Sequence, residues 1–324
     1  MSRTLRTVLQ VVVSGGLLAV LLWQIDVGQT GDLIASSSPV YLLAALGIFL
    51  ATTWGMAWRW RILLVSKGIR EPLGWLTKLY FVSIAAGQVL PTSVGGDAVR
   101  IVEHARRRPD ARGEAVGAVF MERAVGSAAT LVLVAVGLAL AAGRYEGASA
   151  VLWLEVVLVA AMLLLAVLLF HRRTARALQE RVFPLGRRLR LDRPLASLHA
   201  AMHGYREQRG ALALVLGITL GLQSARIVAI WCCGEAVGID VSPLVYAILG
   251  PLLFMVLMVP FTINGLGVRE VFFVAFLARF DVEADAALAT GLLFYAVTVA
   301  AALPGALILL WRSARPAFAR PRVS

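Results

Sequence analysis

Two short segments of the chain combine residue types that suit the binding of an anion. They are PTSVGGDAVR at residues 91–100 and PFTINGLGVR at residues 260–269, and without a gap they share a proline, a glycine, a valine and the final arginine. Proline and glycine interrupt helices, and an interrupted helix leaves unpaired backbone N–H groups that favour an anion. The arginines Arg100 and Arg269 add forked donors that match phosphate. We interpret the segments as the centres of an internal duplication and predict that together they bind a phosphate headgroup.

The charged residues of both segments also have simpler interpretations. Either arginine alone suits snorkelling to its own membrane interface, so the symmetric pair is what favours a binding site. The sequence leaves three roles open for the acids Asp97 and Glu270. They form local ion pairs with these arginines, they contact a cationic part of a headgroup, or they carry a coupling proton. The full set of candidate substrate-binding residues is Gly95, Gly96, Asp97, Arg100, Glu122, Arg123, Arg226, Asn264, Gly265, Gly267, Arg269 and Glu270.

Two polar patches interrupt otherwise apolar segments. Glu122 and Arg123 form one, and Arg226 with Gln223 and Ser224 forms the other. A charged side chain in a membrane helix costs about 2.5–3.5 kcal/mol on insertion scales, so these residues are expected to face protein or a water-filled cavity. Glu122 and Arg123 are adjacent and diverge around a helix, which predicts a different partner for each. Pairing of Glu122 with Arg226 is one hypothesis.

Other kinds of chemistry have no signature in the sequence. It contains no nucleotide-binding loop, no metal-ligand spacing and no catalytic triad, so we predict no catalytic residue, no metal site and no cofactor. Cys232 and Cys233 are adjacent within an apolar run, which favours packing over a disulfide or a metal site.

The composition places the chain among membrane proteins. Of its 324 residues, 60% are hydrophobic and 15% are charged, and the mean hydropathy is +0.82. Apolar runs of about 20 residues predict transmembrane helices, and the lack of alternating segments excludes a barrel. The net charge of +12 lies in short loops beside the apolar runs, as the positive-inside rule describes. We therefore expect no nucleic-acid partner.

The order of apolar and basic segments predicts a topology. We predict that a first span at 7–24 is retained, because no clear cleavage site follows it. Arg3 and Arg6 place its N-terminus in the cytoplasm. The loop at 25–38 is expected outside, and 39–58 returns inward. Because 72–100 is basic on both flanks, we predict a re-entrant hairpin that breaks at 91–96.

The second half of the chain repeats this order in the opposite sense. Residues 39–142 and 211–311 each follow the order span, re-entrant hairpin, span, and the linker at 171–210 is rich in arginine. The prediction is an all-α, polytopic helical membrane protein of a single membrane domain, residues 1–324, with two inverted repeats, each containing a broken re-entrant helical hairpin. Broken helices in inverted repeats are typical of transporters and indicate the binding site. The linker and both termini are expected in the cytoplasm, where the linker contacts anionic lipid headgroups.

The motifs also resemble those of a known family. GGDAVR at 95–100, Glu122-Arg123 followed by Gly126, and NGLGVRE at 264–270 are similar to motifs of the lysylphosphatidylglycerol synthase transmembrane-region family, also called flippase-like domain proteins. The resemblance covers roughly residues 10–312. It implies movement of aminoacylated phosphatidylglycerol to the outer leaflet. In the family's namesake, a separate cytosolic domain makes that lipid. We expect this chain to lack such a domain, so the resemblance implies translocation and not aminoacyl transfer.

These observations predict a flippase or scramblase of the cytoplasmic membrane, a transporter and not an enzyme. Its partner is a membrane phospholipid or lipid-linked substrate: a phospholipid, an aminoacyl-phosphatidylglycerol or a polyprenyl-phosphate lipid. Two alternatives are kept. One is a membrane enzyme acting on lipid-linked substrates, with Asp97 or Glu122 as acid or base. The other is an accessory protein that recruits a lipid-modifying partner enzyme through the linker at 171–210.

Overall fold

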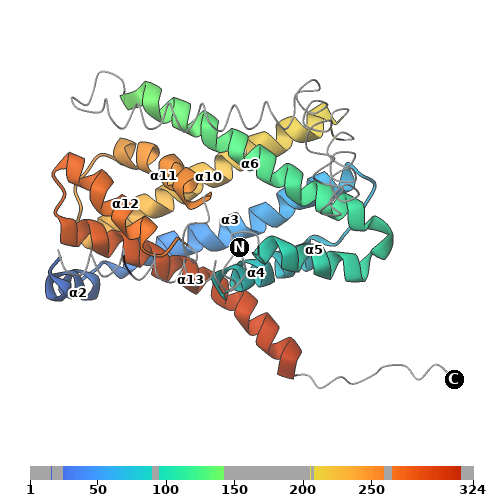
Figure 1. Cartoon of the computed structure of the whole chain (residues 1–324), viewed down its shortest axis with the longest axis horizontal. Helices are drawn as coiled ribbons and strands as arrows, with labels where there is room; N and C mark the ends of the chain where they lie inside the picture. The colour runs from blue at the N-terminus through green and yellow to red at the C-terminus, as the bar shows by residue number, and fades with distance from the viewer. Residues whose placement is uncertain are drawn as a thin grey trace.

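The computed structural model describes residue 16 and the ranges 25–89, 95–141, 205, 208–258 and 265–314. These ranges are almost entirely helical and contain no strand (Figure 1). Several predicted features lie outside the described residues: the first span at 7–24, most of both helix breaks (91–94 and 260–264) and nearly all of the linker at 171–210.

Four long apolar helices cross the molecule. A membrane core of about 30 Å needs about 20 helical residues, and each of the four is longer than that. By length and composition, all four qualify as membrane spans. This confirms the prediction of a polytopic helical membrane protein. The helices are α3 (Pro39–Val65), α6 (Arg112–Ala141), α10 (Arg209–Val237) and α13 (Ala284–Ala314).

Shorter helices flank the two breaks. They are α4 (Leu73–Val89), α5 (Gly95–Arg107), α11 (Pro243–Met258) and α12 (Val268–Leu277). Helix α4 packs on α5, and α11 packs on α12. The two pairs occupy opposite ends of the molecule, and α11 and α12 lie at the left of Figure 1. The re-entrant course of these pairs in a membrane stays a prediction.

The segment predicted as an outside loop at 25–38 differs from the expectation, because it contains a helix. Helix α2 (Val27–Ala35) begins after Asp26, whose carboxylate accepts hydrogen bonds from the backbone N–H groups of Gly28 and Gln29 at 2.8 and 3.1 Å. This is an N-cap, which satisfies two donors that the first turn of a helix leaves unpaired.

Helices α3 and α10 run antiparallel through the centre. The N–H of Ser38 donates to the carbonyl of Ala236 at 2.8 Å, which joins the start of α3 to the end of α10. At the opposite end, the Tyr205 hydroxyl donates to the carbonyl of Leu63 at 3.1 Å. Midway, Gly55 of α3 lies against the Leu222 side chain of α10, where an added Cβ would overlap the leucine.

Each packed pair of helices in the first half has a counterpart in the second. Helix α4 packs on α13, and its counterpart α11 packs on α6. Contacts of α3 with α4 and of α5 with α6 correspond to those of α10 with α11 and of α12 with α13. This correspondence is what a duplication of 39–142 in 211–311 predicts, while the inverted orientation of the repeats in a membrane stays a prediction.

Candidate functional site

Helix α5 carries the first arginine motif. Gly95, its first residue, is buried, and Gly96 lies so close to α4 that an added Cβ would overlap the carbonyl of Ser83. Asp97 lies in the first turn of α5, where the helix dipole favours a carboxylate. Arg100 follows one turn later. Close packing of α5 on α4 therefore fixes where Arg100 enters the interior.

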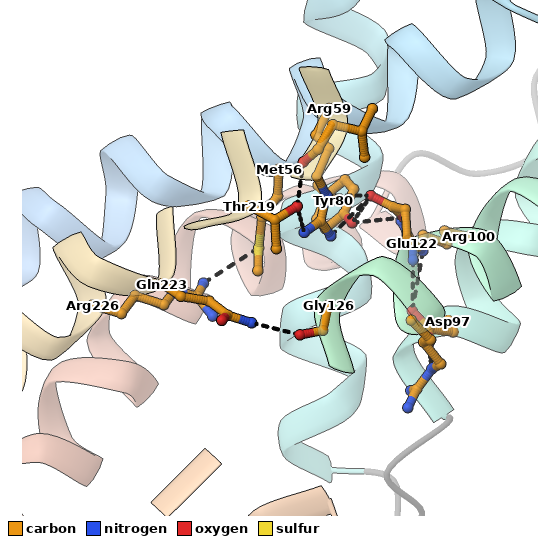
Figure 2. A network of polar contacts seen from close by, with 12 residues as sticks. Met56, Arg59, Tyr80, Asp97, Arg100, Glu122, Gly126, Thr219, Gln223 and Arg226 are labelled. Carbon is orange, nitrogen blue, oxygen red and sulfur yellow. Dashed lines mark hydrogen bonds and ion pairs between the residues drawn. The ribbon is translucent and has the colours of Figure 1, made fainter. Parts of the chain in front are cut away.

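Arg100 is 3% exposed, and its donors are directed at two carboxylates. Its Nη2 lies 2.9 Å from Oδ1 of Asp97, and its Nη1 donates to Oε2 of Glu122 (Figure 2). The guanidinium also lies 4.5 Å from the ring centre of Tyr80 and 4.9 Å from that of Trp60. Since cations bind aromatic faces, the ring contacts add to the ion pairs that hold this charge.

Glu122 of α6 is the centre of the charge network. It is 2% exposed, and its Oε1 accepts a hydrogen bond from Nε of Arg59 at 3.1 Å. The Tyr80 hydroxyl lies 2.9 and 3.0 Å from the two oxygens. Arg59 also donates from Nη1 to the hydroxyl of Thr219 at 3.1 Å. One carboxylate thus joins α3, α4, α5 and α6, and Arg59 extends the network to α10.

The hypothesis that Glu122 pairs with Arg226 is wrong. The ion-pair partners of Glu122 in the structure are Arg59 and Arg100. Arg226 instead donates from Nε to the Thr52 hydroxyl at 3.3 Å. The hypothesis arose because both residues are charges within apolar segments, but the sequence does not define how α6 and α10 are aligned against each other.

Arg59 and Tyr80 were missed as members of the network. The predicted span at 39–58 ends just before Arg59, but α3 continues to Val65, which leaves Arg59 inside the molecule at 6% exposure. Arg59 and Arg61 are two residues apart, so they lie on different faces of a helix. This spacing is a sequence signal that the two arginines have different surroundings. No sequence signal distinguishes Tyr80 from other aromatic residues of the apolar segments.

Arg123 forms the outer part of the network. Its side chain is 40% exposed, and its Nε donates to Oδ2 of Asp97. Glu122 and Arg123 therefore have different partners, as their adjacent positions predicted. Together with Arg59 and Arg100, Arg123 gives the network three guanidinium groups, which pair with the carboxylates of Asp97 and Glu122.

The second arginine motif forms a separate pair at the start of α12. Arg269 and Glu270 are 3% and 0% exposed, and Nε of Arg269 donates to Oε1 of Glu270 at 3.0 Å. The other oxygen of Glu270 accepts from the N–H of Gly267 at 2.7 Å and caps the helix. Gly265 and Gly267 have φ angles of 76° and 86°, in the left-handed region that favours glycine.

The guanidinium groups of both motif arginines lie against the faces of aromatic rings. Arg269 lies 4.4 Å from the ring centre of Tyr295, as Arg100 lies against Tyr80. The local ion pairs that sequence analysis kept as an alternative are present at both motifs. Asn264 lies outside the described residues.

Gln223 and Arg226 extend the polar interior along α10. The amide nitrogen of Gln223 donates to the carbonyl of Gly126 at 3.1 Å and to the Thr130 hydroxyl at 3.2 Å (Figure 2). Both acceptors lie on α6, just beyond Glu122. This polar side of α10 therefore faces the helix that carries the centre of the network.

Long apolar helices that enclose a buried network of charges define an integral membrane protein of the polytopic helical class. The sequence model of the family described as "lysylphosphatidylglycerol synthase TM region" matches residues 7–305, and the chain belongs to this family. Comparison with curated proteins gave no match. In the described part of the chain, no group of three or more His, Cys, Asp or Glu residues could hold a metal ion.

Proposed function

We propose that this protein moves a lipid with a phosphate headgroup between the leaflets of the cell membrane, and that it acts as a transporter and not as an enzyme. The observation that carries the proposal is Arg100. Its guanidinium is buried at the start of a broken helix, and carboxylates occupy its donors. Carboxylate and phosphate oxygens suit the same forked donor, so the carboxylates stand where phosphate oxygens would bind.

The network offers a route for such an exchange. Arg123 is partly exposed and meets a headgroup first, while Asp97, with 15% of its side chain exposed, bridges Arg123 to Arg100. A phosphate that takes the place of Asp97 is bound by both arginines. Glu122 stays in place, because Arg59 and Tyr80 hold it from the other side.

The second motif is proposed to serve the opposite side of the membrane. Arg269 is held by one neighbouring carboxylate, Glu270, which also caps α12. Alternate exposure of Arg100 and Arg269 would pass the phosphate across while the acyl chains stay in lipid. The family and the matched packing of the two halves support this arrangement. Phospholipids, aminoacyl-phosphatidylglycerol and polyprenyl-phosphate lipids all carry the required group.

The test is leaflet exchange of fluorescent phospholipids in proteoliposomes. Arg100→Lys keeps the positive charge but loses the paired N–H donors of the guanidinium group. Arg100→Ala and Arg269→Ala lose both the charge and the donors. The alanine variants are expected to slow exchange by about ten- to a hundredfold, since a hydrogen bond to a charged group contributes about 1.5–3 kcal/mol. Arg106→Ala is the control, because that side chain is 75% exposed. Unchanged exchange in both alanine variants, with normal membrane insertion, would overturn the proposal.

A further inference from the structure

Arg226 lies far from both ends of its helix. Helix α10 runs from Arg209 to Val237. At 1.5 Å per residue, Arg226 is about 26 Å from the start and about 17 Å from the end. Its partner Thr52 is the central residue of α3, which runs from Pro39 to Val65. An arginine in this position cannot reach either membrane interface by snorkelling.

Within the part of the chain that the structure describes, Arg226 makes its hydrogen bonds and its ring contact with neutral groups. Its Nε donates to the Thr52 hydroxyl at 3.3 Å and its Nη2 to the sulfur of Met56 at 3.4 Å. Its guanidinium lies 5.1 Å from the ring centre of Phe49. Among the described residues, the ion pairs that hold Arg59, Arg100 and Arg269 have no equivalent at Arg226. A charge inside a membrane protein without an opposite charge is unfavourable, and such residues mark ion or substrate pathways.

The surroundings of Arg226 connect it to the charge network. Gln223, one turn earlier on α10, binds the backbone of α6 at Gly126, and Gly126 follows Glu122 and Arg123 by one turn (Figure 2). Arg226 therefore lies beside the network but does not share its carboxylates. A hydroxyl at 3.3 Å and a thioether are weak acceptors, so a phosphate oxygen would replace them readily.

We propose that Arg226 binds the phosphate group of the transported lipid at the middle of the membrane, as an intermediate position between the two motif arginines. This inference rests on the proposed function and adds to it a binding residue outside both motifs. Substrate sites of transporters lie near the midplane. The same chemistry would bind a free phosphate ion, so the experiment has to separate the two sources.

The first measurement is stability in detergent. We compare the unfolding midpoints of the wild type, Arg226→Met and Arg226→Lys, with the exposed Arg106→Met as the control. Because Arg226→Met removes a partly buried charge that has no opposite charge beside it among the described residues, we expect it to unfold at the same temperature as the wild type or a higher one. A large loss of stability would overturn the inference, because it would mean that Arg226 balances a carboxylate of the protein.

The second measurement is ligand-dependent stabilisation. Micelles with phosphatidylglycerol are expected to raise the midpoint of the wild type and of Arg106→Met but not that of Arg226→Met. Inorganic phosphate in plain micelles is the second probe. If only inorganic phosphate stabilises through Arg226, the ligand is the free ion and the lipid form of the inference is wrong. If neither probe distinguishes Arg226→Met from the wild type, Arg226 binds no phosphate.

The third measurement is leaflet exchange in proteoliposomes of phosphatidylglycerol and phosphatidylcholine. Arg226→Met is expected to slow exchange by about ten- to a hundredfold, with Arg226→Lys between it and the wild type. Normal exchange by Arg226→Met would leave the proposed function intact and overturn this inference. No exchange by the wild type would contradict the proposed function, while Arg226-dependent stabilisation by phosphatidylglycerol would still support a phosphate site.

Discussion

At Glu122, two guanidinium groups and a phenol meet one carboxylate in the protein interior. Burial of charges costs several kcal/mol for each ion, and ion pairs offset that cost only where the remaining hydrogen-bonding positions are also filled. Here both oxygens of Glu122 accept hydrogen bonds, and Arg59 and Arg100 have further partners in Thr219 and Asp97. A network this complete is rigid as long as every member stays in place.

Glu122→Gln is predicted to destabilise the protein strongly, because it keeps the shape of the side chain and leaves two buried guanidinium groups short of a counter-charge. Loss of one partner of a buried ion pair costs about 3–5 kcal/mol. The control is Glu103→Gln, which removes surface ion pairs with Arg106 and Arg312 and is expected to cost about 0–1 kcal/mol. Chemical unfolding in detergent micelles measures both, and equal effects of the two substitutions would contradict the network.

His104 of α5, outside the four candidate spans, gives a prediction for pH. The side chain is fully buried between Trp60 and Trp75, whose ring centres lie 5.8 and 5.9 Å from that of His104. Neither ring nitrogen of His104 has a hydrogen-bond partner among the described residues. Burial lowers the pKa of His104, and Arg107 and Arg108 lower it further, whereas Glu71 raises it.

The sign of the pH dependence follows from this lowered pKa. The unfolded chain, with a histidine pKa of about 6.5, binds the proton more readily than the folded protein, so stability is fully present above that pH and falls as the pH drops below it. His104→Phe removes the titration and is predicted to flatten this acid dependence. Unfolding curves of both proteins between about pH 5 and pH 8 test this, and parallel pH profiles would contradict it.

Close helix contacts at glycine hold the two halves together. An added Cβ at Gly305 of α13 would overlap the carbonyl of Phe81 in α4, and one at Gly137 of α6 would lie 3.0 Å from the carbonyl of Ala247 in α11. These contacts join the corresponding pairs α4 with α13 and α6 with α11. Small residues at such crossings let helix backbones approach where lipid offers no hydrophobic driving force.

Gly305→Ala is therefore predicted to destabilise the protein, because the new methyl group meets backbone that cannot move aside. Overpacking of this kind costs about 1–3 kcal/mol. Gly217→Ala in α10 is the matched control, since an added Cβ there meets nothing within 4 Å. It is expected to be neutral or to stabilise by up to about 1 kcal/mol through helix propensity. Unfolding in detergent compares the two, and a stable Gly305→Ala would show that the α4–α13 contact is looser than described.

Sequence analysis predicted the helical membrane class and the family, because long apolar runs and the motifs at 95–100 and 264–270 are visible without a structure. It also kept the ion pairs Asp97–Arg100 and Arg269–Glu270 as an alternative, since both are local. It could not predict the contacts of Glu122 with Arg59 and Tyr80. Those depend on how far α3 extends and on how four helices are rotated against one another, which apolar composition leaves undetermined.

At the scale of the molecule, the charged side chains of the described residues are divided between its two ends. At one end α2 meets the start of α13, where the N–H of Asp26 donates to Asp285 at 3.1 Å. Acidic side chains dominate there: Asp26, Asp32, Asp240, Asp281, Glu283 and Asp285. At the other end Arg312 pairs with Glu103 at 3.3 Å. Basic side chains gather there: Arg61, Lys67, Arg70, Arg106, Arg107, Arg108, Arg112, Arg209 and Arg312. By the positive-inside rule, the basic end is expected in the cytoplasm.

Cysteine labelling tests this orientation. In a Cys232→Ser/Cys233→Ser background, Ser36→Cys at the acidic end is predicted to react with a membrane-impermeant maleimide in intact cells. Arg106→Cys at the basic end is predicted to react only after the membrane is opened. Both positions are exposed in the structure. The reverse labelling pattern would contradict the predicted orientation.

Recognition of the phosphate is the central claim, and comparison of two lipids by the wild-type protein tests it most directly. Proteoliposomes would contain trace fluorescent phosphatidylglycerol or fluorescent monoglucosyl-diacylglycerol, whose sugar headgroup has no phosphate, with protein-free liposomes as the baseline. Aminoacyl-phosphatidylglycerol and a polyprenyl-phosphate lipid would complete the series. Our account predicts faster leaflet exchange for at least one phosphate lipid and baseline exchange for the glucosyl lipid. Equal acceleration of all the lipids, or acceleration of none, would contradict it.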